Sequence, residues 1–400
     1  KRQDLMSGIG QMIYLNGDKY DGEWFSSLKQ GTGKLMYING DHYDGMWFND
    51  FKKGNGIFID SNGNKYDGEW LSNSRSGKGI YIDTKGNKYN GLWVENIKTG
   101  QGSLNYANGD SYKGNWKEGR INGKGIMTYS SGDSYDGQWE NGVKQGNGLE
   151  ISIVSGYEYD GGFKNDLFNG RGVFQSKMGE HYDGLWILGK KEGLGVFKSS
   201  FGDIYNGNWE KDLKNGEGHM IFSDGNEYKG QWSNNDITGA GNYTFVNGNK
   251  CEGTFVDGKL NGQGFFNYNN GDKHIGFFYQ GKRNGKGTCE FGNGENYIGE
   301  WKNDKINGQG EYEFSNGDHY EGMFKEEIME GQGTYSYKNG NLYIGEFKDG
   351  KREGLGVFTY TNGNKYIGEF KNGNMEGQGT FTYPNGDKNV GVWKNGKPIN

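Results

Sequence analysis

The tryptophans of this chain recur at one fixed spacing, and that repeat constrains the fold more than any other feature. Trp24, Trp47 and Trp70 lie 23 residues apart, and all 11 tryptophans belong to the same series. Its gaps are filled by phenylalanine, at Phe163, Phe255, Phe278, Phe324, Phe347 and Phe370. This makes 17 repeats in 400 residues, with one longer step of 24 residues from Trp139 to Phe163. A chain filled by one short repeat indicates a stacked array whose function comes from the combined surface.

Each repeat reads as two short β-strands. In residues 19–24 the side chains of Tyr20, Gly22 and Trp24 alternate onto one face, and residues 33–38 alternate in the same way. The pair Asn39-Gly40 predicts a two-residue hairpin turn with positive φ at both residues. Residues 25–30 are expected to form a longer loop. Four glycines in each repeat exclude helices, so we expect an all-β fold: an elongated, twisted, single-layer antiparallel β-meander of about 34 strands.

Glycine between Tyr and Trp has a specific meaning in such a strand, because an aromatic ring can then lie flat across the backbone. Two strands for each repeat predict a solenoid-like ribbon of roughly 160 Å. A single sheet leaves one face uncovered, so its aromatic face is the predicted partner-binding surface. The predicted binding residues are Tyr20, Trp24, Tyr43, Trp47, Tyr66, Trp70, Tyr89, Trp93, Tyr112, Trp116, Tyr135, Trp139, Tyr182, Trp186, Tyr205, Trp209, Tyr228, Trp232, Tyr297 and Trp301.

Composition and charge narrow the classes of function. Only 31% of residues are hydrophobic, which favours a thin structure. The net charge is −6 and basic residues come at most in pairs, so nucleic acid is excluded as a partner and anionic lipid is weakly supported. Two cysteines make no disulfide framework and fit a reducing cytoplasm. No catalytic triad, phosphate loop or metal-ligand spacing is present, so we expect no enzyme, no cofactor and no metal site.

The 24-residue step places one extra residue in the segment 149–156. An added strand residue is most simply a β-bulge that raises the local twist. This predicts a kink that divides one continuous array into an N-terminal segment, residues 1–148, and a C-terminal segment, residues 149–400.

Three repeats lack the tyrosine and carry Cys251, His274 and Asn389 in its place. These substitutions are either neutral changes that the repeat tolerates, or they mark a differently shaped segment that makes a bend or a distinct contact. Cys251, His274 and Cys289 are not expected to bind metal, since no second ligand pair completes a tetrahedral set.

On the opposite face, the residue after the tyrosine is acidic in the first repeats and becomes apolar later. Either strand propensity or a second contact surface explains this change. The residues concerned are Ile275, Ile298, Ile344, Ile367 and Val390, and an early cluster open to the same two explanations is Ile57, Ile59, Ile80 and Ile82.

The pattern Tyr-x-Gly-x-Trp followed by Gly-x-Gly at a 23-residue period resembles the MORN repeat (membrane occupation and recognition nexus) across residues 8–393. The resemblance implies an extended antiparallel sheet, often curved into an aromatic trough, that acts as a scaffold. Such arrays occur in ciliary radial-spoke heads, in cortical cytoskeletal proteins and in membrane-contact proteins.

Three functional hypotheses follow. The leading one is a non-enzymatic scaffold of a cytoskeletal assembly, most plausibly the ciliary axoneme, that binds helices or extended segments of other proteins in the trough. The second is a peripheral membrane tether that binds anionic phospholipid. The third is a homodimeric scaffold of the cell cortex.

Overall fold

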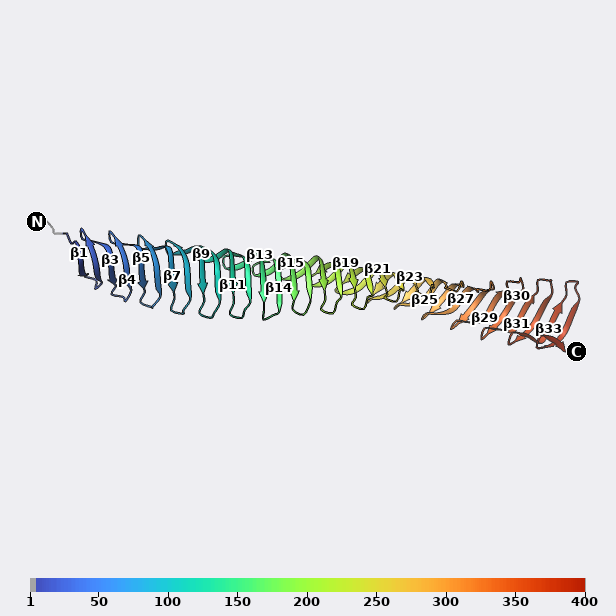
Figure 1. The fold of residues 1–400 in the computed structure, drawn as a ribbon. Helices are drawn as coiled ribbons and strands as arrows, with labels where there is room; N and C mark the ends of the chain where they lie inside the picture. Colours follow the sequence, from blue (N-terminus) through green and yellow to red (C-terminus); the bar gives the residue numbers. More distant parts are fainter. Residues whose placement is uncertain (1–4, 400) are drawn as a thin grey trace. The chain divides into compact units, whose positions relative to one another are not determined.

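The computed structural model describes residues 5–399 and divides into two compact units, residues 1–200 and residues 201–400. Within residues 5–399 the regular elements are 35 strands, and no helix is present. Figure 1 shows the strands of each unit side by side in one sheet, with no second layer of described chain over either face. The predicted all-β meander of hairpin repeats is confirmed.

Unit 1 contains β1–β17, and a seven-residue strand alternates with a longer one in most repeats. The bounds are β1 Gly8–Ile13, β2 Lys19–Phe25, β3 Leu28–Met36, β4 His42–Phe48, β5 Phe51–Ile59, β6 Lys65–Leu71, β7 Ser74–Ile82, β8 Lys88–Val94, β9 Ile97–Asn105, β10 Ser111–Lys117, β11 Arg120–Thr128, β12 Ser134–Glu140, β13 Val143–Ser152, β14 Tyr157–Lys164, β15 Leu167–Ser176, β16 His181–Ile187 and β17 Lys190–Lys198.

Unit 2 contains β18–β35 in the same alternation. The bounds are β18 Ile204–Glu210, β19 Leu213–Ile221, β20 Glu227–Ser233, β21 Asp236–Thr244, β22 Lys250–Val256, β23 Lys259–Asn267, β24 Lys273–Tyr279, β25 Lys282–Glu290, β26 Asn296–Lys302, β27 Lys305–Glu313, β28 His319–Lys325, β29 Ile328–Ser336, β30 Leu342–Lys348, β31 Lys351–Thr359, β32 Lys365–Lys371, β33 Asn374–Thr382, β34 Lys388–Lys394 and β35 Lys397–Ile399.

A row of glycines crosses each sheet at right angles to the strands. Gly22 of β2 pairs with Gly33 of β3, and Gly33 pairs with Gly45 of β4. The same pairing recurs in unit 2, for example between Gly299 and Gly310. The glycine row is the line over which the tyrosine rings lie.

The two turns of each repeat are the reverse of those predicted. At Asn39-Gly40 only the glycine has positive φ; the Gly40 N–H donates to Tyr37 O and the Tyr37 N–H to Asp41 O, which is a type I turn followed by a glycine bulge. The segment expected as a longer loop is instead a two-residue turn in which both residues have positive φ, as in Ser26 (51°) and Ser27 (65°). The second strand therefore starts earlier than predicted, at Leu28.

A β-bulge stands in the second strand of each hairpin and was not predicted. Between the pairs Gly22–Gly33 and Trp24–Lys29, the single residue Glu23 faces three residues of β3. The bulge is centred on Gly31, whose φ of 60° favours glycine. Gly-x-Gly thus combines a bulge glycine with a glycine of the central row.

The extra residue of the 24-residue step enters a loop and not a strand bulge. β13 and β14 keep continuous register from Gly146–Phe163 to Ser152–Tyr157, so the predicted bulge within 149–156 is wrong. Four residues now connect the strands, and the Gly156 N–H donates to Ser152 O at 2.9 Å. The inserted segment lies inside unit 1, because the units divide after Ser200.

Neighbouring repeats are joined along both edges of the sheet by side-chain acceptors. The Asp18 carboxylate accepts the Ile38 N–H at 2.9 Å, and the Asp50 carboxylate accepts the Lys29 N–H at 2.9 Å. Aspartate and asparagine in the turns therefore bind the adjacent repeat as well as their own loop, which makes stability a property of the stack.

Candidate partner-binding faces

The tyrosine and tryptophan of each repeat occupy what we call the Tyr slot and the Trp slot, the positions of Tyr20 and Trp24. A Cβ added to Gly33 would overlap the hydroxyl end of the Tyr20 ring, and one added to Gly56 would meet Tyr43 in the same way. Each ring therefore covers a glycine of the neighbouring strand, as its Tyr-x-Gly pattern predicted. The Tyr20 hydroxyl donates to Glu23 O at 3.1 Å, and the Trp24 indole N–H donates to Gly10 O at 3.1 Å.

The slot rings pack edge to face in a ladder along each unit, and in unit 2 the ladder is interrupted where Cys251 replaces the slot tyrosine. Tyr43 lies 5.1 Å from Trp47 of its own repeat and 5.3 Å from Trp70 of the next, at interplanar angles of 87° and 83°. Such pairs contribute about 0.5–1.5 kcal/mol each beyond the burial of their surface. The ladder is thus the core of a sheet that has no second layer among the described residues.

The slot rings are buried, so the prediction that they form an exposed binding face is wrong. Tyr43 is 0% exposed and Trp24, the most open slot tryptophan, is 8% exposed. Tyrosine lying flat on glycine and tryptophan wedged between tyrosines leave no ring face to solvent. The same burial holds for Tyr20, Trp47, Tyr66, Trp70, Tyr89, Trp93, Tyr112, Trp116, Tyr135, Trp139, Tyr182, Trp186, Tyr205, Trp209, Tyr228, Trp232, Tyr297 and Trp301.

A row of cations covers the ring ladder of unit 1, and the sequence reasoning missed it. The Lys52 ammonium lies 5.0 Å from the ring centres of both Tyr43 and Trp70 and 4.6 Å from that of Phe58. Burial lowers the pKa of Lys52 to about 8, while the surrounding rings favour its charged form. The sequence feature that could have predicted this row is a Lys or Arg five residues after the Trp slot. It occurs at Lys29, Lys52, Arg75, Lys98, Lys144 and Lys191.

Unit 2 carries a second row of rings on the same face, beside the slots. We call this row the outer ladder, and it consists of Tyr243, Phe245, Phe266, Tyr268, Phe291, Tyr312, Phe314, Tyr335, Tyr337, Phe358, Tyr360, Phe381 and Tyr383. Ring centres within one repeat lie 4.7 Å apart in the case of Tyr312 and Phe314, and the step from Phe314 to Tyr335 is 5.7 Å.

Most rings of the outer ladder are half-buried, and Tyr383 is exposed. A cavity of about 460 Å³ opens between them, lined by Phe291, Tyr312, Phe314, Phe324 and Met329 among others. A concave apolar lining with a few polar groups at its rim is typical of binding sites. The outer ladder, and not the slot ladder, therefore presents aromatic surface to solvent. Its sequence signal is an aromatic-x-aromatic pair before Asn-Gly.

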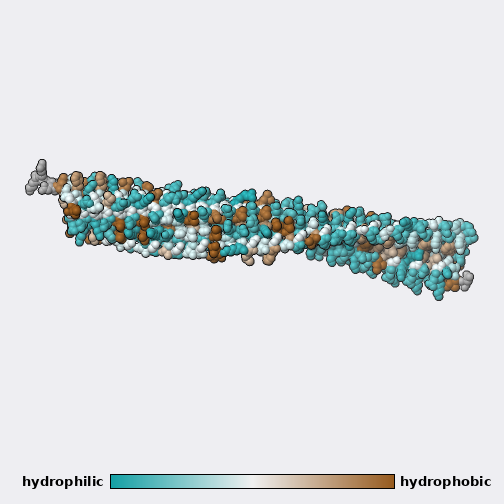
Figure 2. Space-filling view, in the orientation of Figure 1, coloured by the Kyte–Doolittle hydropathy of each residue, from teal (hydrophilic) through white to brown (hydrophobic). Residues whose placement is uncertain are grey.

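The apolar residues predicted for a second surface lie on the opposite face, which we call the back face. Ile275, Ile298, Ile344, Ile367 and Val390 are all exposed there. The four residues of the early cluster are half-buried; they are Ile57, Ile59, Ile80 and Ile82. Figure 2 shows that hydrophobic side chains gather in separate patches on a mainly hydrophilic surface.

The repeats without a slot tyrosine are filled in different ways. The His274 ring lies across Gly276 and Gly287 as a tyrosine would, but neither ring nitrogen has a hydrogen-bond partner. Desolvation, with a smaller contribution from Arg283, lowers the pKa of His274 to about 4. In the preceding repeat the Leu260 side chain covers Gly253 and Gly264 beside Cys251.

Neither a cluster of metal-ligating side chains nor a membrane-spanning helix is found in the described part of the chain. Among residues 5–399, no group of three His, Cys, Asp or Glu side chains is placed to hold a metal ion. Burial raises the pKa of the Cys251 and Cys289 thiols to about 11, so both thiols stay protonated at neutral pH. No helix within the described residues is long and apolar enough to cross a membrane.

Comparison with known families agrees with this repeat geometry. The family model "MORN repeat" matches 16 successive segments, from residues 20–42 to residues 366–388. The chain belongs to the MORN-repeat family. The matched segments each begin at the Tyr slot, and the seventeenth repeat, which begins at Asn389, lies beyond the last of them.

Solved structures similar to this MORN-repeat chain share little sequence with it. The TCP10 domain of Danio rerio CPAP, solved with a peptide of STIL, is 11% identical with a TM-score of 0.30, over 62% of this chain and 98% of that one. The SAS-4 (dCPAP) TCP domain of Drosophila melanogaster is 17% identical with a TM-score of 0.21, over 44% and 84%. TM-scores this low carry no functional argument. A search of the curated proteins returns no match.

Proposed function

We propose that this MORN-repeat protein is a non-enzymatic scaffold that binds segments of other proteins along the outer ladder of unit 2. The supporting observation is the half-buried row of rings around the cavity at Tyr312 and Phe314. Aromatic side chains supply large contact areas at low conformational cost, and they dominate the energetics of protein interfaces.

The slots explain why the binding surface is rigid. Tyr320 and Phe324, which lie beside the outer ladder, are buried and pack edge to face at 5.0 Å. Their neighbour Tyr335 is further fixed by its hydroxyl, which donates to the Asp318 carboxylate at 2.8 Å. A pre-organised ring surface loses little entropy when it binds a partner.

We propose further that the assembly is cytoskeletal, with the ciliary axoneme as its location and a radial-spoke-like complex as the setting. The support is the family resemblance together with a surface suited to binding proteins along the repeats. The cytoplasmic alternatives are a scaffold of the cell cortex, homodimeric in form, and a tether at the membrane periphery that binds anionic phospholipid.

Proximity labelling from the tagged full-length chain in ciliated cells tests this function. We expect axonemal proteins among the labelled neighbours, and we expect F314S/Y337S to lose the neighbours that depend on the outer ladder. F201S is the matched control, because Phe201 is 85% exposed and lies outside the outer ladder. Neighbours unaffected by F314S/Y337S would contradict the proposed surface, and cortical neighbours would contradict the axonemal setting.

Two solution measurements separate the alternatives. Cosedimentation with phosphatidylinositol-phosphate vesicles at physiological salt should show no binding if the chain is a protein scaffold. Binding would favour the membrane tether. Light scattering should show a monomer, whereas a stable dimer would favour the cortical homodimer.

A further inference from the structure

A continuous row of side chains crosses the back face of unit 2, and its members face one another in register. Phe265 pairs with Ile275, Ile275 with Thr288, and Thr288 with Ile298. After an interruption, Thr334 pairs with Ile344, and the pairs continue through Val357, Ile367 and Thr380 to Val390. We call the row from Phe265 to Val390 the back-face ridge. It crosses β23–β34, a length of roughly 50 Å.

The ridge is accessible to solvent. Ile298 is 56% exposed and Val390 is 70% exposed, while the alternating Thr and Val side chains are half-buried. Strand propensity explains β-branched residues at single positions, but it does not require them to line up over many repeats. Two mainly apolar and β-branched stretches, one on each side of Glu311 and Glu321, are typical of an interaction surface.

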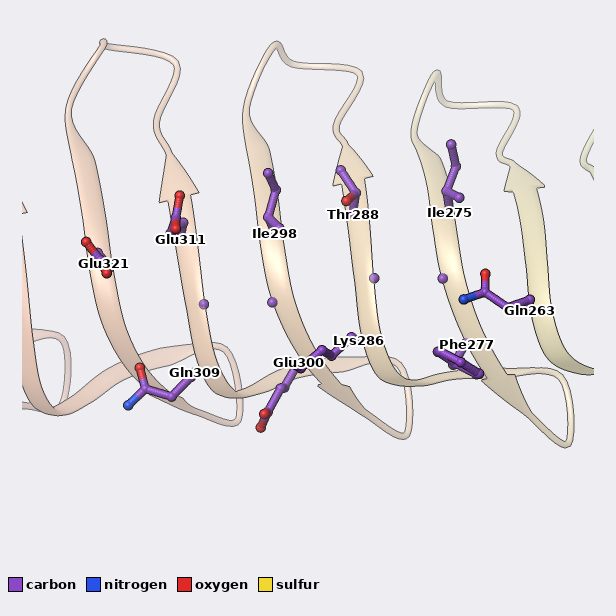
Figure 3. A pocket seen from close by; sticks show the side chains of 14 residues that line it. Gln263, Ile275, Phe277, Lys286, Thr288, Ile298, Glu300, Gln309, Glu311 and Glu321 are labelled. Carbon is purple, nitrogen blue, oxygen red and sulfur yellow. The ribbon is translucent and has the colours of Figure 1, made fainter.

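A groove runs beside the ridge at its first half. The groove encloses about 510 Å³ and has the glycine row as its floor, at Gly276, Gly287, Gly299 and Gly310. In Figure 3 one wall is formed by Ile275, Thr288, Ile298, Glu311 and Glu321, and the other by Gln263, Phe277, Lys286, Glu300 and Gln309. The missing glycine side chains therefore make a channel across the strands.

The interruption of the ridge is a pair of like charges. Glu311 and Glu321 face each other directly across β27 and β28, and both are exposed. Carboxylates placed opposite each other destabilise a sheet, so this pair has a cost that an approaching cation would relieve. The row that faces the ridge across the glycines runs from Glu300 to Val392. Beyond Lys286, the ridge and this row hold no Lys or Arg and five glutamates: Glu300, Glu311, Glu321, Glu346 and Glu369.

We propose that the back-face ridge binds an amphipathic helix of another protein, with a basic residue of that helix between Glu311 and Glu321. One repeat advances by about 9.6 Å, which is two strand spacings. One heptad of a helix advances by about 10.5 Å, so a helix slightly tilted from the ridge sets one apolar residue against each repeat. An extended segment repeats its side chains on one face every ~6.7 Å, so it sets a side chain in step only with every second repeat.

A second copy of this chain fits the ridge less well than such a helix. Glu311 and Glu321 lie near the middle of the ridge, so a two-fold axis at the middle of the ridge would bring two such pairs together and leave four carboxylates without a cation. Like charges in a shared interface are strongly unfavourable. The helix with a basic residue is therefore the occupant that the charge pattern favours.

A designed helix tests the proposal on the full-length chain. The probe is a labelled peptide of about 28 residues, ~42 Å long, with one leucine facing the ridge in each heptad and lysine in place of a central leucine. A comparison peptide carries glutamate at that position. We expect the lysine peptide to bind about tenfold more tightly, as measured by fluorescence anisotropy.

Variants of exposed residues complete the design, and circular dichroism confirms that each one folds. E311K/E321K should reverse the preference between the two peptides, and I344T/I367T should weaken both severalfold. D44K is the matched control, because Asp44 occupies the same position of a repeat in unit 1.

Absence of binding, equal affinity for both peptides, or no reversal in E311K/E321K would overturn the proposal. A dimer in light scattering that I344T/I367T dissociates would instead assign the ridge to a second copy. The peptide measurements do not involve the outer ladder, so failure of the peptides to bind leaves the proposed function standing.

Discussion

The Tyr slot is the position at which one residue affects two strands at once, because its ring covers glycines of both. His274 fills the slot with the correct shape but leaves two buried nitrogens without partners. A tyrosine there would regain the hydroxyl bond that Tyr297 makes to Glu300 O at 2.9 Å. Arg283 does not stand in the way, since Arg75 lies over Tyr66 at 5.1 Å in an ordinary repeat.

We predict that H274Y raises the free energy of unfolding by about 1–2 kcal/mol, because it replaces unpaired buried nitrogens by a bonded hydroxyl. Urea denaturation followed by tryptophan fluorescence measures the change. C251Y is the control substitution, because the new ring must displace Leu260 from Gly253 and Gly264 and should therefore gain less. A loss of stability in H274Y would refute the role assigned to the slot.

The same histidine predicts a pH dependence. Its pKa in the folded state, about 4, lies below its ordinary value of 6.5, so the unfolded chain binds more protons between these values. The wild-type chain thus loses stability as pH falls from 6.5 towards 4. The advantage of H274Y should grow by about 1–2 kcal/mol between pH 7 and pH 5. An advantage that is equal at both pH values would show that His274 is not buried in its neutral form.

At the element scale, the turns show which parts of the fold a sequence reveals. The alternation of Tyr20, Gly22 and Trp24 predicted the strands and the side of the sheet on which each residue lies. It also predicted that an aromatic ring covers the strand glycine. The tighter turn was missed, because the first repeat has Ser26 and Ser27 there. Other repeats carry the usual residues of such a turn at this position, as in Asn141-Gly142 and Asp257-Gly258. The burial of the rings was also missed, since periodicity gives the face of a residue but not the packing of its neighbours.

Turn residues differ in what they contribute, and this leads to a matched pair of substitutions. Glu327 has a φ of 70°, and within residues 5–399 its side chain accepts no hydrogen bond from the neighbouring repeat. Asp304 has a φ of 71°, and its carboxylate accepts the Arg283 N–H at 2.8 Å. We predict that E327G stabilises the chain by about 1 kcal/mol through relief of backbone strain. D304G should bring no gain, because it also loses the bond between repeats. Thermal unfolding compares the two, and equal shifts would contradict the assigned role of Asp304.

At the scale of the whole molecule, stability comes from rings that are shared between repeats. Fourteen of the 28 tyrosines are buried in Tyr slots. Desolvation raises the pKa of slot tyrosines in both units, to about 12 in Tyr89 and Tyr205. A phenol whose pKa is raised by folding stabilises the chain below pH 10, and this contribution is lost as pH rises through the folded value.

Alkaline titration tests this sharing of rings. We predict that the phenolate absorbance at pH 10.5 reaches at most half of its final amplitude, and that the rest appears together with unfolding near pH 12. Circular dichroism on the same samples reports the unfolding. Smooth ionisation of all tyrosines around pH 10, with the sheet intact, would show that the slots are open to water.

Hydroxyl-radical footprinting of the full-length chain, read by mass spectrometry, tests the central claim most directly. The claim is that the slot ladder is the core and the outer ladder is the accessible aromatic surface. Tyr337 and Tyr383 should therefore be oxidised quickly, while Trp301, Trp393 and Tyr320 react slowly, although indole is the more reactive ring in solution. Oxidation of Trp301 and Trp393 as fast as Tyr383 would contradict the account.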